Sequence, residues 1–154
     1  VTVLGAGGTA QAVVAALAGR GVERCTVLVR DPGRTTALRD TAAAFDVTLE
    51  VAQLHAGAPA LSAALVISTL PPRAADPLAA GGWTPGQMLL DVVYDPWPTA
   101  IADAVSAAGG RVISGAVMLL HQAARQVELM TGQAAPVEAM RTALRAAVPH
   151  AGAV

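Results

Sequence analysis

The chain has 154 residues, of which 54% are hydrophobic and 14% charged, and its formal net charge is −1 at pH 7. This length suits one domain with a sizeable core, and the high apolar content excludes a disordered chain. A net charge near zero provides no electrostatic basis for binding nucleic acid or an anionic membrane, so we expect neither partner. There is no secretory signal and no apolar run long enough to span a bilayer, which predicts a cytoplasmic protein.

Residue types that often carry chemistry are scarce. All ten basic residues are arginines, so no lysine of this chain can act in catalysis. The single cysteine, Cys25, lies in an apolar run, which predicts a buried free thiol. The histidines and acidic residues show no spacing typical of metal ligands, and we predict no metal site. The chain starts inside its first predicted strand without an initiator methionine, as a piece of a longer protein would.

The N-terminal stretch has the order strand, glycine-rich turn and helix. An apolar run over residues 1–4 leads into a turn, and an alanine-rich segment over 11–17 favours a helix. This order is typical of the first half of a dinucleotide-binding βαβ unit, although a plain glycine turn before an amphipathic helix would read similarly. The turn that we expect to bind the cofactor is Gly5-Ala6-Gly7-Gly8-Thr9-Ala10.

Each small residue of this turn has a physical role in that interpretation. Gly5 would allow the sharp turn out of the strand, and Gly7 would let a pyrophosphate approach the backbone closely. Ala10 would keep the helix close to the sheet. The amides of Gly7, Gly8 and Thr9 would then face the phosphates at the positive end of the helix dipole.

Five further strands are expected along the chain. A continuous apolar run predicts a strand buried on both faces at 64–68, whereas the alternating run at 47–51 predicts an edge strand. The other expected elements are strands at 25–29, 88–93 and 111–114, and helices at 35–45, 99–108, 117–130 and 136–148.

Six strands with intervening helical segments predict an α/β fold. We expect one dinucleotide-binding domain over 1–154, with a doubly wound, mostly parallel, Rossmann-like sheet of strand order 3-2-1-4-5-6. The ligand of such a sheet lies at the carboxyl ends of the strands, where the order reverses. That edge would bring together the glycine turn, the turn at Arg30, the segment 91–96 and the cofactor-contacting loop of Ser68, Thr69 and Leu70.

The residues after the second strand bear on the choice between NADP and NAD. Arg30 and Arg34 could hold a 2′-phosphate from two sides, whereas Asp31 could accept hydrogen bonds from ribose hydroxyls. Two cations outweigh one carboxylate beside a dianion, so we predict NADP, with NAD as the alternative. All three residues could also be solvated turn residues.

Several motifs in this order and spacing resemble the shikimate dehydrogenase family. The resemblance extends over nearly the whole chain and concerns only the C-terminal, cofactor-binding domain of that family. Its most specific pieces are Asp91-Val92-Val93-Tyr94-Asp95-Pro96 with Thr99, and Gly115 followed by Met118-Leu119-Leu120-His121-Gln122.

The resemblance implies the NADP-binding domain of an oxidoreductase that reversibly reduces 3-dehydroshikimate to shikimate in the chorismate pathway to aromatic amino acids. It places the catalytic Lys–Asp pair in an N-terminal substrate domain, so no catalytic residue is expected in this chain. The helices over 117–148 would face that absent domain.

By resemblance, Arg30 and Arg34 match the family's Asn-Arg-Thr-x-x-Arg clamp for the 2′-phosphate, with Val29 and Asp31 in place of its Asn and Thr. Tyr94 and Gln122 match positions that line the shikimate pocket.

The resemblance also implies that Val93, Val117 and Met118 contact the cofactor. Val117 stands where the family usually has a glycine beside the nicotinamide, in Gly-Leu-Gly-Met, so its side chain could narrow that pocket.

Other functions fit part of this pattern. An NAD-dependent quinate/shikimate dehydrogenase would use Asp31 for the ribose. A non-catalytic dinucleotide-binding module would need only the glycine turn and the sheet. A nicotinamide domain of a glutamyl-tRNA reductase-like enzyme is a more distant alternative, because it would not require the segments around Tyr94 and Gln122.

Overall fold

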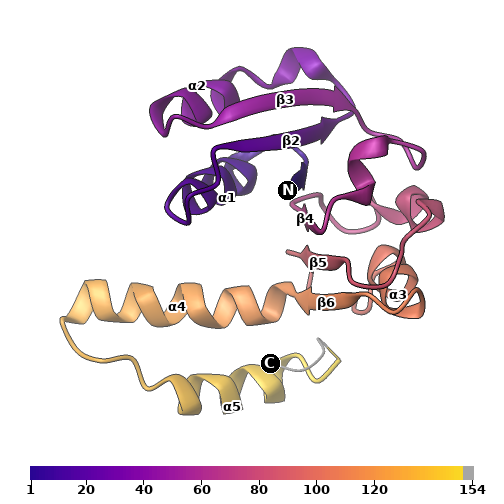
Figure 1. Ribbon diagram of the computed structural model, residues 1–154. Helices are drawn as coiled ribbons and strands as arrows, with labels where there is room; N and C mark the ends of the chain where they lie inside the picture. Colours follow the sequence, from indigo (N-terminus) through magenta and orange to yellow (C-terminus); the bar gives the residue numbers. More distant parts are fainter. Residues whose placement is uncertain (151–154) are drawn as a thin grey trace.

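The computed structural model describes residues 1–150 and shows an α/β fold built on one parallel sheet (Figure 1). The six strands have the order β3-β2-β1-β4-β5-β6, as predicted, and every neighbouring pair is parallel. β3 lies at one edge, in agreement with its alternating sequence. The strands are β1 (Thr2–Leu4), β2 (Arg24–Val29), β3 (Thr48–Gln53), β4 (Leu65–Ser68), β5 (Met88–Asp91) and β6 (Arg111–Ser114).

The helices fall close to their predicted positions. They are α1 (Gly8–Ala18), α2 (Thr36–Ala44), α3 (Ala100–Ala107), α4 (Gly115–Thr131) and α5 (Val137–Ala147), with 3₁₀ turns η1 (Pro32–Arg34), η2 (Pro59–Ser62) and η3 (Asp76–Ala80). The strand expected over 88–93 ends at Asp91, because the Val93 amide donates to the Asp91 side chain and not to a neighbouring strand. No helix within residues 1–150 is long and apolar enough to cross a membrane.

Alternate side chains of the strands form two separate cores, one on each face of the sheet. Val3 and Val27 pack with Val14 of α1 and Leu38 of α2 on one face. Cys25 belongs to this core as a buried free thiol, as predicted, and burial raises the pKa of that thiol. The core on the opposite face joins β1, β2, β4 and β5 to η2, η3 and α3 through Leu4, Leu28, Leu61, Val66, Leu78, Leu89, Ile101 and Val105.

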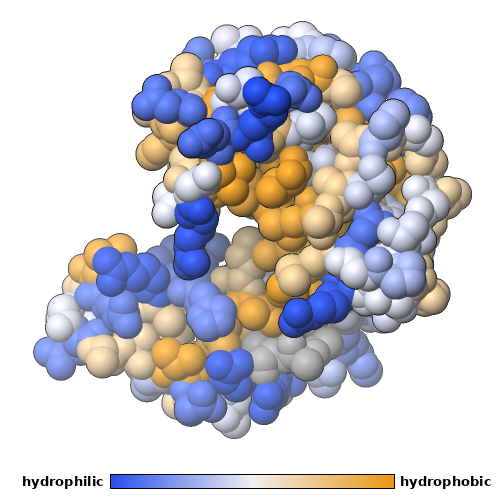
Figure 2. All heavy atoms as spheres, in the orientation of Figure 1, coloured by the Kyte–Doolittle hydropathy of each residue, from blue (hydrophilic) through white to orange (hydrophobic). Residues whose placement is uncertain are grey.

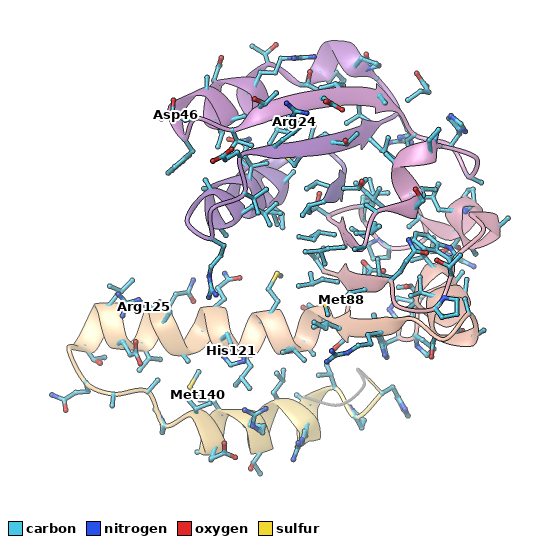
Figure 3. The ribbon with its side chains drawn as sticks, viewed as in Figure 1. Arg24, Asp46, Met88, His121, Arg125 and Met140 are labelled. Atoms are coloured by element: carbon cyan, nitrogen blue, oxygen red, sulfur yellow. The ribbon has the colours of Figure 1, made fainter. Side chains whose placement is uncertain are left out.

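The last two helices form a pair beside the β6 edge. α4 continues from the end of β6, and α5 returns alongside it (Figure 1). Ala116 and Leu120 of α4 are buried against Val137 and Met140 of α5, and Met140 points toward α4 in Figure 3. A third, smaller core therefore holds this helical pair together.

Candidate functional site

The carboxyl ends of β1, β2 and β4 surround a cavity of about 400 Å³. Three segments that are distant in sequence meet there, which is the gathering that the strand order predicts. The cavity is lined by Gly5, Ala6 and Gly7 of the β1–α1 turn, by Val29 at the end of β2 with Arg30, Asp31 and Arg34 after it, and by Thr69, Leu70 and Pro71 after β4.

Gly5 and Gly7 are required for different reasons. Gly5 has φ +98°, and a Cβ there would lie 2.8 Å from Thr69 Oγ1, so the turn excludes any side chain at this position. The Thr69 hydroxyl is itself fixed, because it donates to the Leu4 carbonyl at 2.7 Å. A Cβ on Gly7 would meet nothing within 4 Å, so the space beside Gly7 is open to a ligand.

Gly7 lines this cavity and directly precedes the first turn of α1, which presents free backbone donors. Gly7 is the N-cap of α1, no side chain caps the helix, and no acidic residue lies in its first turn. The amides of Gly8 and Thr9 are therefore available at the positive end of the helix dipole, the arrangement that binds phosphate groups. Ala10 is fully buried against the sheet, where a larger residue would push α1 away.

The turn after β2 carries two exposed arginines. Arg30 and Arg34 line the cavity, and neither forms an ion pair within residues 1–150. The Arg30 carbonyl accepts from Gln53 Nε2 at 3.1 Å, which ties the turn to β3. A third arginine, Arg39, is occupied elsewhere, since its Nε donates to Thr35 Oγ1 at 3.2 Å.

Asp31 has a structural task within this turn. Its Oδ1 accepts from the Gly33 amide at 2.9 Å and caps η1. Part of its hydrogen-bonding capacity is therefore used by its own backbone, while both guanidinium groups remain free for a ligand.

A second cavity, of about 380 Å³, adjoins the first through Thr69, Leu70 and Pro71. Its other side is formed by the segment after β5, including Val93 and Tyr94. Val93 is buried, whereas Tyr94 is 39% exposed. The structure thus brings Tyr94 next to the loop that also lines the Arg30 cavity.

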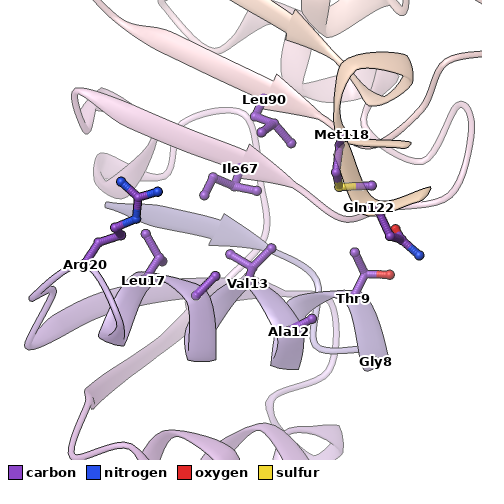
Figure 4. Close-up of a pocket in the computed structure, with 11 residues that line it drawn as sticks. Gly8, Thr9, Ala12, Val13, Leu17, Arg20, Ile67, Leu90, Met118 and Gln122 are labelled. Carbon is purple, nitrogen blue, oxygen red and sulfur yellow. The ribbon is translucent and has the colours of Figure 1, made fainter. Parts of the chain in front are cut away.

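A groove of about 680 Å³ separates α1 from α4 (Figure 4). Met118 and Gln122 of α4 project into it toward Thr9 and Val13 of α1, as Figure 4 shows. Ile67 of β4 and Leu90 of β5 form its floor with Leu17. Figure 2, in the orientation of Figure 1, shows this apolar hollow between α1 and the α4–α5 pair.

Two expected contact residues lie elsewhere. Ser68 is fully buried and lines none of the cavities described here. Val117 is partly buried and lines none of the three cavities described above. Asp91 and Thr99 are not among the predicted site residues, although a carboxylate at the end of an apolar strand is a signal that the sequence contains.

Asp91 is buried at the end of β5 and anchors its surroundings. The Thr99 hydroxyl donates to Asp91 Oδ2 at 2.8 Å, and the Val93 amide donates to Oδ1 at 3.3 Å. Burial raises the pKa of Asp91 above its ordinary value of 3.8, although both hydrogen bonds act to lower it. No group of His, Cys, Asp and Glu among residues 1–150 is arranged to hold a metal ion.

The chain is similar in sequence and in fold to several known proteins. Residues 115–145 match the family described as Shikimate 5'-dehydrogenase C-terminal domain. The chain is 37% identical over 155 residues to shikimate dehydrogenase (NADP(+)) of Moorella thermoacetica, covering 95% of the chain and 52% of that protein. It is also 37% identical over 153 residues to shikimate dehydrogenase (NADP(+)) of Halobacterium salinarum, covering 94% of the chain and 54% of that protein.

Solved structures agree with these sequence matches. The crystal structure of Mycobacterium tuberculosis shikimate dehydrogenase is similar with a TM-score of 0.78 and 46% identity, over 95% of this chain and 55% of the other. Quinate dehydrogenase from Corynebacterium glutamicum in complex with NAD is similar with a TM-score of 0.78 and 27% identity, over 94% of this chain and 54% of the other. The chain spans about half the length of the curated relatives it matches.

Proposed function

The chain belongs to the shikimate dehydrogenase family as its C-terminal domain, and on this premise we propose that it is the NADP-binding part of an oxidoreductase acting on shikimate. The reaction we propose is the reversible reduction of 3-dehydroshikimate to shikimate. The observation that carries the proposal is the cavity in which the Gly5–Gly7 turn meets the free guanidinium groups of Arg30 and Arg34. We place this biosynthetic activity in the cytoplasm.

The cavity accounts for the two charged parts of the dinucleotide. The pyrophosphate lies on the amides that open α1, where Gly7 leaves room for it. Arg30 and Arg34 bind the 2′-phosphate, and each charge-assisted contact contributes about 1.5–3 kcal/mol. The Asp31 carboxylate reduces this attraction but does not cancel it, because two cations oppose one anion.

Val93, which lines the second cavity, and Met118, which lines the groove, would hold the nicotinamide end of the cofactor. The hydride that reduces the substrate carbonyl comes from the bound dinucleotide. The Tyr94 hydroxyl and the Gln122 amide bind substrate hydroxyl groups, for which both have suitable donors and acceptors. Their exposure supports this role, since neither side chain is needed in the core.

The catalytic Lys–Asp pair and most of the substrate pocket belong to an N-terminal domain. This part of the proposal rests on the absence of lysine from the sequence and on the greater length of the relatives. That domain would face α4 and α5, over residues 117–148, and the apolar groove between α1 and α4 offers it a surface.

A second candidate is an NAD-dependent quinate/shikimate dehydrogenase. Two observations favour it: Asp31 stands beside Arg30 at the end of β2, and the quinate dehydrogenase of similar fold was solved with NAD. In this case the Asp31 carboxylate would accept hydrogen bonds from the ribose, in addition to capping η1.

Calorimetric titration of the 154-residue chain with NADPH and NADH tests the cofactor. We expect tighter binding of NADPH, by about tenfold or more for each arginine that holds the phosphate. Arg30→Ala should weaken NADPH binding and leave NADH binding nearly unchanged. Arg111→Ala is the matched control, because Arg111 is exposed at the start of β6, at the opposite edge of the sheet. Equal affinity of the wild type for the two cofactors would favour the NAD-dependent alternative.

A further inference from the structure

Three polar side chains lie side by side at the carboxyl ends of neighbouring strands. The register of the sheet pairs Ser68 of β4 with Asp91 of β5, and Asp91 with Ser114 of β6. Their exposed fractions are 0%, 1% and 4%. A carboxylate is thus enclosed between two hydroxyl groups, at the edge of the sheet where the proposed cofactor site lies.

The two carboxylate oxygens of Asp91 accept hydrogen bonds from different segments. Its Oδ1 accepts from the Val93 amide, and its Oδ2 accepts from the Thr99 hydroxyl. Thr99 is also the N-cap of α3, and its Oγ1 accepts from the Ala102 amide at 3.3 Å. One side chain therefore connects the end of β5, the segment that follows it and the first turn of α3.

This arrangement of buried polar groups has a cost in stability. Burial raises the pKa of Asp91, which means that the ionised carboxylate is held at a cost in stability. The Ser68 hydroxyl lowers that pKa from one side, although its geometry falls short of a hydrogen bond. Ser68 Oγ and Ser114 Oγ are both buried without a hydrogen-bond partner in the described part of the chain. Polar groups kept in such surroundings suggest a requirement for geometry.

The segment held by Asp91 is also fixed from the α4 side. The Gly115 amide donates to the Val93 carbonyl at 3.2 Å, and a Cβ on Gly115 would collide with the Val92 carbonyl oxygen. Val92 and Val93 thus lie between the Asp91 carboxylate and the first residue of α4. The next residue, Tyr94, is the first of this segment to reach the cavity with an exposed side chain.

We propose that Asp91 is a positioning residue that, with Thr99, fixes the Val92–Val93 segment and so directs the Tyr94 side chain into the cavity. Asp91 contacts neither cofactor nor substrate in this role. The inference rests on the proposed function, because the orientation of Tyr94 matters only if this side chain binds the substrate. It also identifies which buried groups the substrate side of the site depends on.

The chain contains one tyrosine, so Tyr94 can be observed alone. The whole chain is produced with 3-fluorotyrosine, and the ¹⁹F resonance is recorded for the wild type, Thr99→Val and Asp91→Asn. We expect one resonance displaced from that of free fluorotyrosine in the wild type. In both variants it should move toward the free value, because Tyr94 samples more orientations. Thr99→Ser keeps the hydroxyl and should restore the wild-type resonance.

Ala107→Gly is the control for a purely structural role. Ala107 is exposed in the last turn of α3, so the change destabilises that helix without touching the Asp91–Thr99 bond. It should lower the melting temperature and leave the Tyr94 resonance in place. Thr99→Val nearly preserves side-chain shape, so it decides the question if Asp91→Asn does not fold. An unmoved resonance in folded Thr99→Val would overturn the inference.

Titration of the same samples with NADPH and NADH separates this inference from the proposed function. If the wild type bound NADPH and NADH equally well, the cofactor assignment would be contradicted, and the ¹⁹F result would still stand. A wild-type NADPH preference with an unmoved Tyr94 resonance in the folded variants would contradict only the role of Asp91.

Discussion

At the scale of single residues, two glycines of one turn are needed for different reasons, one for folding and the other for ligand binding. Gly5 is required by the backbone, since its φ is +98° and the Thr69 hydroxyl occupies the space beside it. Gly7 has an extended backbone that any residue can adopt, with open space beside it. The need for glycine at position 7 therefore comes from the ligand.

Gly7→Ala should consequently have only a small effect on stability, about 1 kcal/mol or less, because alanine is a poorer N-cap than glycine. It should weaken NADP⁺ binding by about tenfold or more, or roughly 1.4 kcal/mol, because the Cβ occupies space that the pyrophosphate needs. Thermal unfolding and calorimetric titration measure the two effects. Gly5→Ala, which should lower the melting temperature, is the comparison. A similar loss of stability in both variants would contradict this division of roles.

The buried carboxylate of Asp91 predicts a pH dependence of stability. Its pKa is raised in the folded state, so the folded chain holds the proton more tightly than the unfolded chain does. The resulting stabilisation is fully present below pH 3.8 and is lost as pH rises through the raised pKa. The loss amounts to about 1.4 kcal/mol for each pH unit between the two pKa values.

The Asp91→Asn variant lacks the titrating carboxyl group and is therefore the reference against which the wild type is measured. Urea unfolding of the wild type and the variant from pH 4 to pH 7 gives the difference in their free energies of unfolding. We expect the wild type to lose stability relative to Asp91→Asn as pH rises, and the difference to become constant once the pH exceeds the raised pKa of Asp91. A difference that grows in favour of the wild type would show that Asp91 has a lowered pKa.

At the scale of elements, the position of α4 depends on its first residue. Gly115 follows β6 directly and lies against the Val92 carbonyl, with no room for a side chain. This close approach sets where Met118 and Gln122 stand relative to α1, since both belong to the first two turns of α4. The α4–α5 pair adds Leu120 and Met140 as an anchor farther along.

Gly115→Ala should therefore be strongly destabilising. The added Cβ would collide with backbone, so relief requires movement of β5 or α4, and we expect a loss of about 3 kcal/mol or more. For a chain of this size, that corresponds to a fall in melting temperature of roughly 6–12 °C. Gly8→Ala is the control, because a Cβ on Gly8 meets nothing within 4 Å. Equal melting temperatures for the two variants would contradict the packing of α4 against Val92.

At the scale of the whole molecule, one side of the sheet is incompletely covered. α1 and α2 cover β1 to β3 on that side, while Ile67 and Leu90 of β4 and β5 face the groove between α1 and α4. Parallel sheets are normally covered on both faces. The groove is consistent with our proposal that a further domain completes the enzyme.

The chain alone should bind dinucleotide and catalyse nothing. The reason is that it has a cavity suited to a dinucleotide but no lysine, the residue that we propose acts with an aspartate in catalysis from a further domain. Purified chain is mixed with NADP⁺ and shikimate, and NADPH formation is followed by absorbance. Calorimetric binding of NADP⁺ to the same sample provides the positive control. Turnover above the rate without protein would refute the assignment of catalysis to another domain.

The sequence by itself determined the elements and their order. Periodicity and turn residues are local properties, so six strands, five helices and the glycine turn followed from runs of a few residues. The strand order 3-2-1-4-5-6 followed from the connection rules of α/β sheets. The meeting of Arg30 and Arg34 with the glycine turn in one cavity was predictable for the same reason.

Only the tertiary structure decided where individual side chains point. Ser68 and Thr69 are adjacent in sequence, yet Ser68 is buried in the sheet and Thr69 lines the cavity, because successive residues of a strand end face opposite ways. The bond from Thr99 to Asp91 depends on how the chain returns from β5 to α3. The contact of Gly115 with Val92 depends on how closely α4 approaches the sheet. These are distances between segments brought together by packing, and no local pattern in the sequence specifies them.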